Sequence, residues 1–189
     1  ADGGADVDFQ VSGVDATKEF ETINLTSAGS SKNTVAIADG GGTAPAGLKT
    51  LNVDGAAPLK MTLTGGAATG AAFSAASATG AQTITWGGNF TSITGGSAAD
   101  SLDLSGSFLG ATATKTVDGG DGIDTITLTG NIANLNSVTA GASHSFSNVE
   151  AVIHATTVLE ADNADNTATV AVDKLGLGNV IAAITNLDT

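Results

Sequence analysis

The sequence predicts an all-β fold, a parallel β-solenoid of the β-roll or β-helix kind, and leaves a β-sandwich as the alternative. Short runs alternate apolar residues with Thr, Ser, Asn or Asp, and most of them end in the turn formers Gly, Asp or Ser. The runs recur at a narrow range of spacings. Aromatic residues make up only 4% of the 189 residues, and small aliphatic side chains alone can fill a narrow solenoid interior.

The alternating runs predict strands in chain order. They are ETINLTS (21–27), NTVAIAD (33–39), KTLNVDG (49–55), KMTLTGG (60–66), QTITWGG (82–88), DSLDLSG (100–106), DTITLTG (124–130) and EAVIHAT (150–156). FTSITGG (90–96) and TATKTV (112–117) are candidate strands between them. Ile84, Ile93 and Leu102 lie nine residues apart, and a short repeat indicates units that bury their apolar faces only by stacking. A sandwich would use about seven to nine antiparallel strands with turns every 8–12 residues.

The predicted solenoid region covers residues 1–156, and a different unit follows at 157–189. That unit begins with an acidic, Asn-rich loop and has one alternating run at 167–172. It ends in KLGLGNVIAAITNL, which fits either a short helix or a final strand. We expect residues 157–189 to be the start of a further module.

The charge of the chain restricts its partners. All six basic residues are lysines, and 19 acidic residues leave a net charge of −13. Nucleic-acid binding needs a basic face, and anionic membrane surfaces repel an acidic chain, so neither partner is expected. No stretch approaches the roughly 20 apolar residues of a membrane helix, so no membrane insertion is expected. The small partner that this charge favours is a cation.

One turn carries a calcium-binding pattern. Residues 119–127, GGDGIDTIT, match G-G-x-G-x-D-x-U-x at every fixed position. Glycines allow a tight turn that exposes backbone carbonyls, and the aspartate adds negative charge before the strand begins. Calcium prefers six to eight hard oxygen ligands at about 2.3–2.6 Å. The segment therefore resembles an RTX-type calcium-binding β-roll, although Gly-Asp clusters can also be ordinary turns that cap strands.

The resemblance implies that one turn supplies half of a calcium site and that a matching turn one coil away completes it. The partner is GGSAADSLD (95–103), a degenerate match with Ala98 at a glycine position. The implied ligands are the carbonyls of Gly95, Ser97, Gly120 and Gly122 and the carboxylates of Asp100 and Asp124, with Asp118 and Asp121 adding charge or binding directly. Asp100 and Asp124 are 24 residues apart, so the half-turn between them must be longer than a nonapeptide unit.

The composition resembles that of bacterial S-layer proteins of the RTX-secreted type. The chain is acidic, rich in Ala, Thr, Gly, Asn and Asp, and free of Cys and Arg. Its segments FETINLTS, LKTLNVDG and FSNVEAVIHA resemble the recurring strand units of those proteins. The resemblance implies an extracellular structural segment at the bacterial cell surface, stabilised by calcium, with copies of itself in a lattice as partners and cell-surface polysaccharide as a further candidate. The alternative is a binding module of an RTX-type adhesin.

No enzymatic activity is expected. The only two histidines, His144 and His154, have a spacing that fits no common zinc signature. No G-x-S-x-G sequence occurs in the strand–turn–helix setting that a serine hydrolase requires.

Overall fold

The computed structural model describes residues 6–11, 20–39, 47–64, 70–87, 90–105, 115–129 and 145–154. These residues form strands and turns, and they contain no helix. Within this described part, no helix is therefore available that could cross a membrane. The terminal unit predicted at 157–189 lies outside the described residues.

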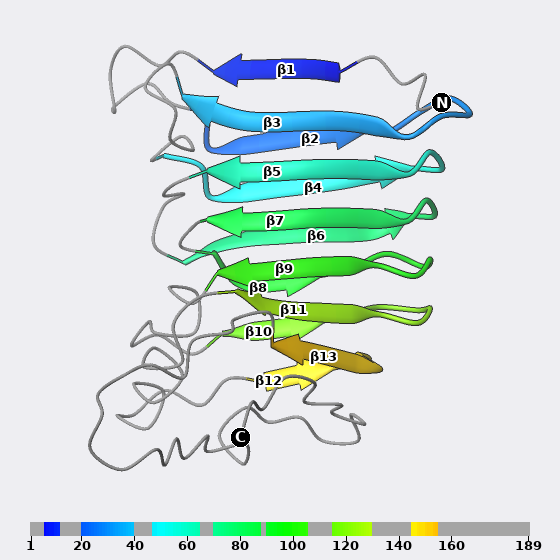
Figure 1. The fold of residues 1–189 in the computed structure, drawn as a ribbon. Helices are drawn as coiled ribbons and strands as arrows, with labels where there is room; N and C mark the ends of the chain where they lie inside the picture. The colour runs from blue at the N-terminus through cyan, green and yellow to red at the C-terminus, as the bar shows by residue number, and fades with distance from the viewer. Residues whose placement is uncertain are drawn as a thin grey trace, which may run out of the picture.

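The strands form two parallel sheets between which the chain alternates (Figure 1). Sheet A contains β1 (Asp6–Val11), β3 (Asn33–Asp39), β5 (Leu59–Thr64), β7 (Gln82–Gly87), β9 (Ser101–Ser105), β11 (Thr125–Thr129) and β13 (Ala151–His154). Sheet B contains β2 (Thr22–Thr26), β4 (Thr50–Gly55), β6 (Ala71–Ala78), β8 (Phe90–Thr94), β10 (Thr116–Asp118) and β12 (Ser145–Ser147). Every neighbouring pair is parallel. The predicted solenoid is confirmed, and the antiparallel sandwich is wrong.

Equivalent apolar residues stack on one another from coil to coil. In sheet A, Ile84 pairs with Leu102 after 18 residues, and Leu102 pairs with Ile126 after 24 residues. The longer coil confirms that the half-turn after β9 is extended, and the extra residues fall within 106–114, outside the described part of the chain. Because a parallel ladder aligns strands residue by residue, each inward-facing side chain contacts its equivalent above and below.

The core contains aromatic side chains as well as the small aliphatic ones expected from the composition. Trp86 is 2% exposed and packs edge-on against Phe73 and Phe90, with ring centroids 4.8 and 5.0 Å apart. This confirms the packing role expected for the single tryptophan. Edge-to-face pairs contribute about 0.5–1.5 kcal/mol beyond the area they bury, so the three rings stabilise the middle coils.

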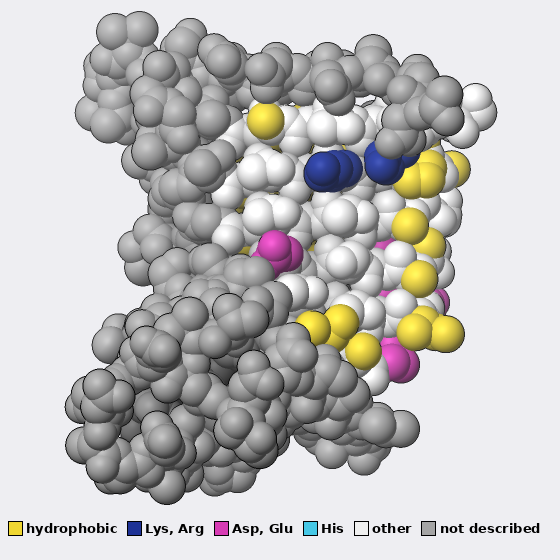
Figure 2. Space-filling model, viewed as in Figure 1, with side chains coloured by type: hydrophobic (Ala, Val, Ile, Leu, Met, Phe, Trp, Pro, Cys, Tyr) yellow, Lys and Arg dark blue, Asp and Glu magenta, His cyan; other side chains and the backbone are white. Residues whose placement is uncertain are grey.

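The side chains that alternate with the core point outwards and are mostly small and uncharged. On β7, Thr83 and Thr85 are exposed on either side of the buried Ile84. Figure 2 shows this face of sheet A, on which lysine and acidic side chains are sparse. Since outward threonines suit a pleated, half-buried surface, the alternation in the sequence is accounted for by the two-sheet architecture.

Strand ends on one side of the solenoid are joined by short turns, seen on the right in Figure 1. We call this stack the turn column; its members are residues 27–32, 56–58, 79–81, 95–100, 119–124 and 148–150. Both RTX-like turns belong to it. The fold therefore positions the predicted calcium ligands on one side of the molecule, where sheet B leads into sheet A.

Candidate calcium site in the turn column

The structure brings the two RTX-like turns together, one coil apart. Gly95 donates its backbone N–H to the carbonyl of Asp118 at 2.7 Å. Asp121 donates its N–H to the carbonyl of Gly96 at 3.0 Å. Turn 95–100 therefore stacks directly on turn 119–124, which is the arrangement that a shared site requires.

The motif glycines are needed for this stacking whether or not a metal binds. A Cβ at Gly95 would overlap the carbonyl oxygen of Gly119, and a Cβ at Gly119 would overlap that of Asn148. Gly122 has a φ of 125°, which side chains disfavour. Ala98, at the equivalent position, is not among the described residues with positive φ, so the two turns differ in conformation there.

A row of carboxylates, which we call the carboxylate column, runs through the turns at the start of sheet A. It consists of Asp100, Asp124 and Glu150, whose following residues are in register. Oδ1 of Asp100 accepts the N–H of Gln82 at 2.7 Å. Oδ1 of Asp124 accepts the N–H of Asp100 at 2.7 Å, and Oε2 of Glu150 accepts the N–H of Asp124 at 2.6 Å. Each carboxylate thus caps a backbone N–H one coil earlier in the chain.

The two aspartates of the carboxylate column differ at their second oxygen. Oδ2 of Asp100 accepts the N–H of Gly96 at 2.6 Å. The equivalent donor in the next turn, the N–H of Gly120, is directed to Oδ1 of Asp118 at 3.2 Å. Oδ2 of Asp124 consequently has no hydrogen-bond partner in the described structure, although Asp124 is 0% exposed. A buried carboxylate oxygen without a donor is costly.

The electrostatic surroundings oppose ionisation of both buried aspartates. Burial raises the pKa of Asp124 to about 6; the hydrogen bond from the Asp100 N–H opposes this rise, and the charges of Asp100, Glu150 and Asp118 add to it. Burial also raises the pKa of Asp100, against the hydrogen bonds from Gly96 and Gln82. All the charged groups that shift the pKa of Asp124 are acidic. Either a proton or a bound cation would relieve this site.

The oxygens around Asp124 suit a hard cation. No hydrogen bond to the carbonyl oxygens of Gly95, Ser97, Gly120 or Gly122 is found within the described residues, which leaves these oxygens available as ligands. No three His, Asp or Glu side chains of the described part converge closely enough to hold a metal alone. A calcium ion here would therefore depend on carbonyls together with carboxylates, which is a ligand set that calcium accepts.

Asn148 and Glu150 join the site without having been predicted. Asn148 has a φ of 49° and donates from Nδ2 to Oδ1 of Asp118 at 2.8 Å. The sequence signal for Glu150 was a charged residue ahead of a strand, shared with Glu21 and Lys49. That likeness is incomplete, because Glu21 and Lys49 precede strands of sheet B, where they form an ion pair, whereas Glu150 precedes a strand of sheet A.

Without calcium, stability should fall as the pH rises from about 5 to about 7. A carboxyl whose folded pKa is raised to about 6 stabilises the fold while it is protonated, and this contribution is lost as the pH rises through that value. The expected loss is about 1 kcal/mol in the free energy of unfolding. Urea unfolding in calcium-free buffer at the two pH values measures it. A stability that increases over the same interval would contradict the burial of Asp124.

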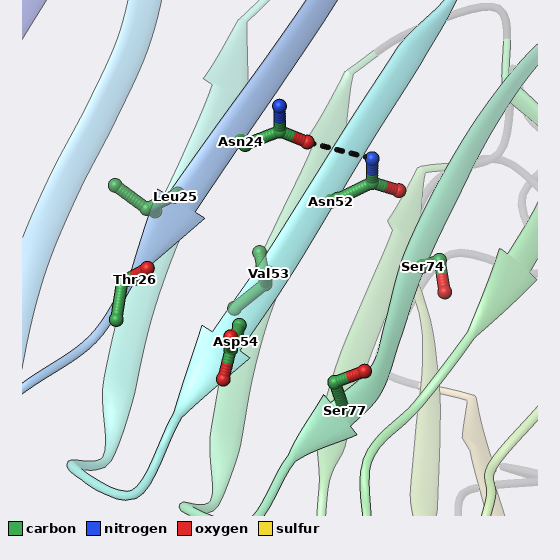
Figure 3. Close-up of a pocket in the computed structure, with 8 residues that line it drawn as sticks. All are labelled: Asn24, Leu25, Thr26, Asn52, Val53, Asp54, Ser74 and Ser77. Atoms are coloured by element: carbon green, nitrogen blue, oxygen red, sulfur yellow. Dashed lines mark hydrogen bonds between the residues drawn. The ribbon is translucent and has the colours of Figure 1, made fainter.

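A second polar feature lies on the outward face of sheet B. It is a cavity of about 370 Å³ across β2, β4 and β6 (Figure 3). Its lining residues are Asn24, Leu25, Thr26, Asn52, Val53, Asp54, Ser74 and Ser77.

Comparison of the chain with protein-family models, with curated proteins and with solved structures found no match.

Proposed function

We propose that this chain is a calcium-stabilised structural segment of a secreted bacterial surface-layer protein. The observation that carries the proposal is the buried Oδ2 of Asp124, which lacks a donor inside a column of acidic side chains. A divalent cation supplies the positive charge that allows these carboxylates to ionise together.

Asp124 is the main carboxylate ligand in this proposal, supported by the carbonyls of Gly120 and Gly122. Asp118 and Asp121 add negative charge from the same turn, and Gly95 and Ser97 offer carbonyls from the turn above. Both oxygens of Asp100 already accept backbone N–H groups. We therefore assign Asp100 chiefly to holding the two turns in register.

A lattice role agrees with the architecture of the chain. Stacked coils make a rigid unit whose stability is a sum over neighbouring repeats, and a unit of this kind can transmit load and hold a fixed spacing. The proposed location is the extracellular bacterial surface, the proposed partners are further copies of the chain, and the proposed role is structural rather than catalytic.

Calcium should promote ordered assembly of the parent protein, and magnesium should replace it poorly. Copies with this negative charge repel one another at low salt, and calcium lowers the repulsion while stabilising the turns. Magnesium keeps its water and requires a tight octahedral shell. Light scattering and electron microscopy with each ion test this. Sheets that form equally well in magnesium or in chelator would defeat the lattice proposal.

The alternative is a binding module of an RTX-type adhesin. The polar cavity on sheet B supports it, because a surface that serves only as scaffold needs no concave polar site. Ordered sheets from the calcium-loaded parent favour the surface-layer role, whereas a monomer that binds glycans without assembling favours the adhesin.

A further inference from the structure

A β-bulge in β6 creates the cavity on sheet B. Asn52 pairs with Ser74 and Asp54 pairs with Ser77, so two steps along β4 match three steps along β6. A bulge of this kind bends its strand and re-aims side chains. Without it, Ser77 would follow Ser74 at an odd interval and face the core. With it, Ser77 is exposed beside Asp54 on the outward face.

The cavity presents donors and acceptors side by side. Asn52 donates from Nδ2 to Oδ1 of Asn24 at 2.8 Å, which leaves Nδ2 of Asn24 as a donor and Oδ1 of Asn52 as an acceptor. Figure 3 shows these amides in a row with the Ser74 hydroxyl, and Asp54 next to Ser77. The side chains of Asp54 and Ser77 make no hydrogen bond with other described residues. All these groups are therefore available to a ligand.

The chemistry of the lining selects one class of ligand. No lysine lines the cavity, and Asp54 together with the net charge of −13 disfavours anions. The apolar lining residues are Leu25 and Val53, of which Val53 is buried in the core, so an apolar ligand would gain little. Each hydroxyl of a sugar both donates and accepts, which matches the mixture of carboxylate, amides and hydroxyls.

We propose that this cavity binds a segment of neutral polysaccharide, with Asp54 and Asn52 as acceptors and Asn24, Ser74 and Ser77 as donors. The outward face of sheet B continues from the cavity with small hydroxyl residues such as Ser92 and Thr94, so a chain rather than a single sugar can lie along it. The site deepens the adhesin alternative, and it does not depend on the turn column. It can therefore succeed or fail independently of calcium binding.

Titration of the whole chain with neutral oligosaccharides tests the proposal. Maltotetraose, cellotetraose and chitotetraose serve as probes, and backbone amide chemical shifts report binding with and without calcium. Saturable shifts confined to β2, β4 and β6 are expected for at least one probe. Because a hydrogen bond to a charged group contributes about 1.5–3 kcal/mol, Asp54→Asn should weaken binding about tenfold or more. Ser77→Ala should weaken it about threefold.

Thr116→Ala is the matched control, because Thr116 is an exposed hydroxyl residue on β10 of the same sheet. It should leave binding unchanged, and all three exposed positions should leave the melting temperature close to that of the parent. An alginate oligomer, which carries carboxylates, should not bind. The proposal is overturned if no probe gives saturable shifts, if the shifts lie elsewhere, if Asp54→Asn binds as well as the parent, or if alginate binds equally.

Discussion

Calcium should raise the melting temperature of this chain by roughly 5–10 °C above that in chelator. A ligand that binds only the native state adds about 2.7 kcal/mol at a hundredfold excess over its dissociation constant. For a chain of about this length, each kcal/mol shifts the melting temperature by about 2–4 °C. The physical source is Asp124, which is buried, lacks a donor at Oδ2 and lies among acidic neighbours.

Differential scanning calorimetry in millimolar calcium, in equal magnesium and in chelator measures this shift. Magnesium matches the charge and ionic strength of calcium, so a shift produced by screening alone would appear equally with both ions. Identical midpoints in calcium and chelator would mean that the Gly-Asp clusters are ordinary turns that cap strands. The glycine requirements of the stacked turns would remain, because they arise from the contact between backbones.

Asp124→Asn should reverse its effect on stability according to whether calcium is present. In chelator near neutral pH the substitution removes a buried charge, and it should stabilise the fold by on the order of 1–3 kcal/mol. The new amide can also donate where Oδ2 now lacks a donor, because the carbonyl of Asn148 lies beside the same Gly119. In calcium the substitution should destabilise, since it removes the main carboxylate ligand.

Two comparison variants sharpen this experiment. Asp100 is also buried, at 2% exposed, but both its oxygens accept N–H groups, so Asp100→Asn places an amide donor against a donor and should destabilise with or without calcium. Asp103→Asn, on the partly exposed face of β9, should change little in either condition. If Asp124→Asn lowers stability equally in calcium and in chelator, the carboxylate is a structural cap like Asp100 and calcium has no part in it.

Local pattern predicted most strands because alternation depends only on the side of the sheet that each residue faces. Strand β6 was missed, since AAFSAASA offers little contrast between alanines that are buried and those that are exposed. The doubled spacing from Met61 to Ile84 was its only trace. Strand β12, with three residues, was too short to show a period. Tertiary pairing with neighbouring coils made strands of segments whose own preference is weak.

The sequence by itself determined that coils stack and that glycine turns lie before strands, because side-chain alternation and turn chemistry are local properties. It also placed Asp100 and Asp124 at equivalent points of two turns. Only the tertiary structure decided that Asn148 and Glu150 join them, and that the Gly120 N–H turns to Asp118 and leaves Asp124 one donor short. The bulge that creates the cavity on sheet B was equally invisible in the sequence. Such features depend on how strands some 20–30 residues apart align, and that register is set by the summed packing of whole coils rather than by any single residue.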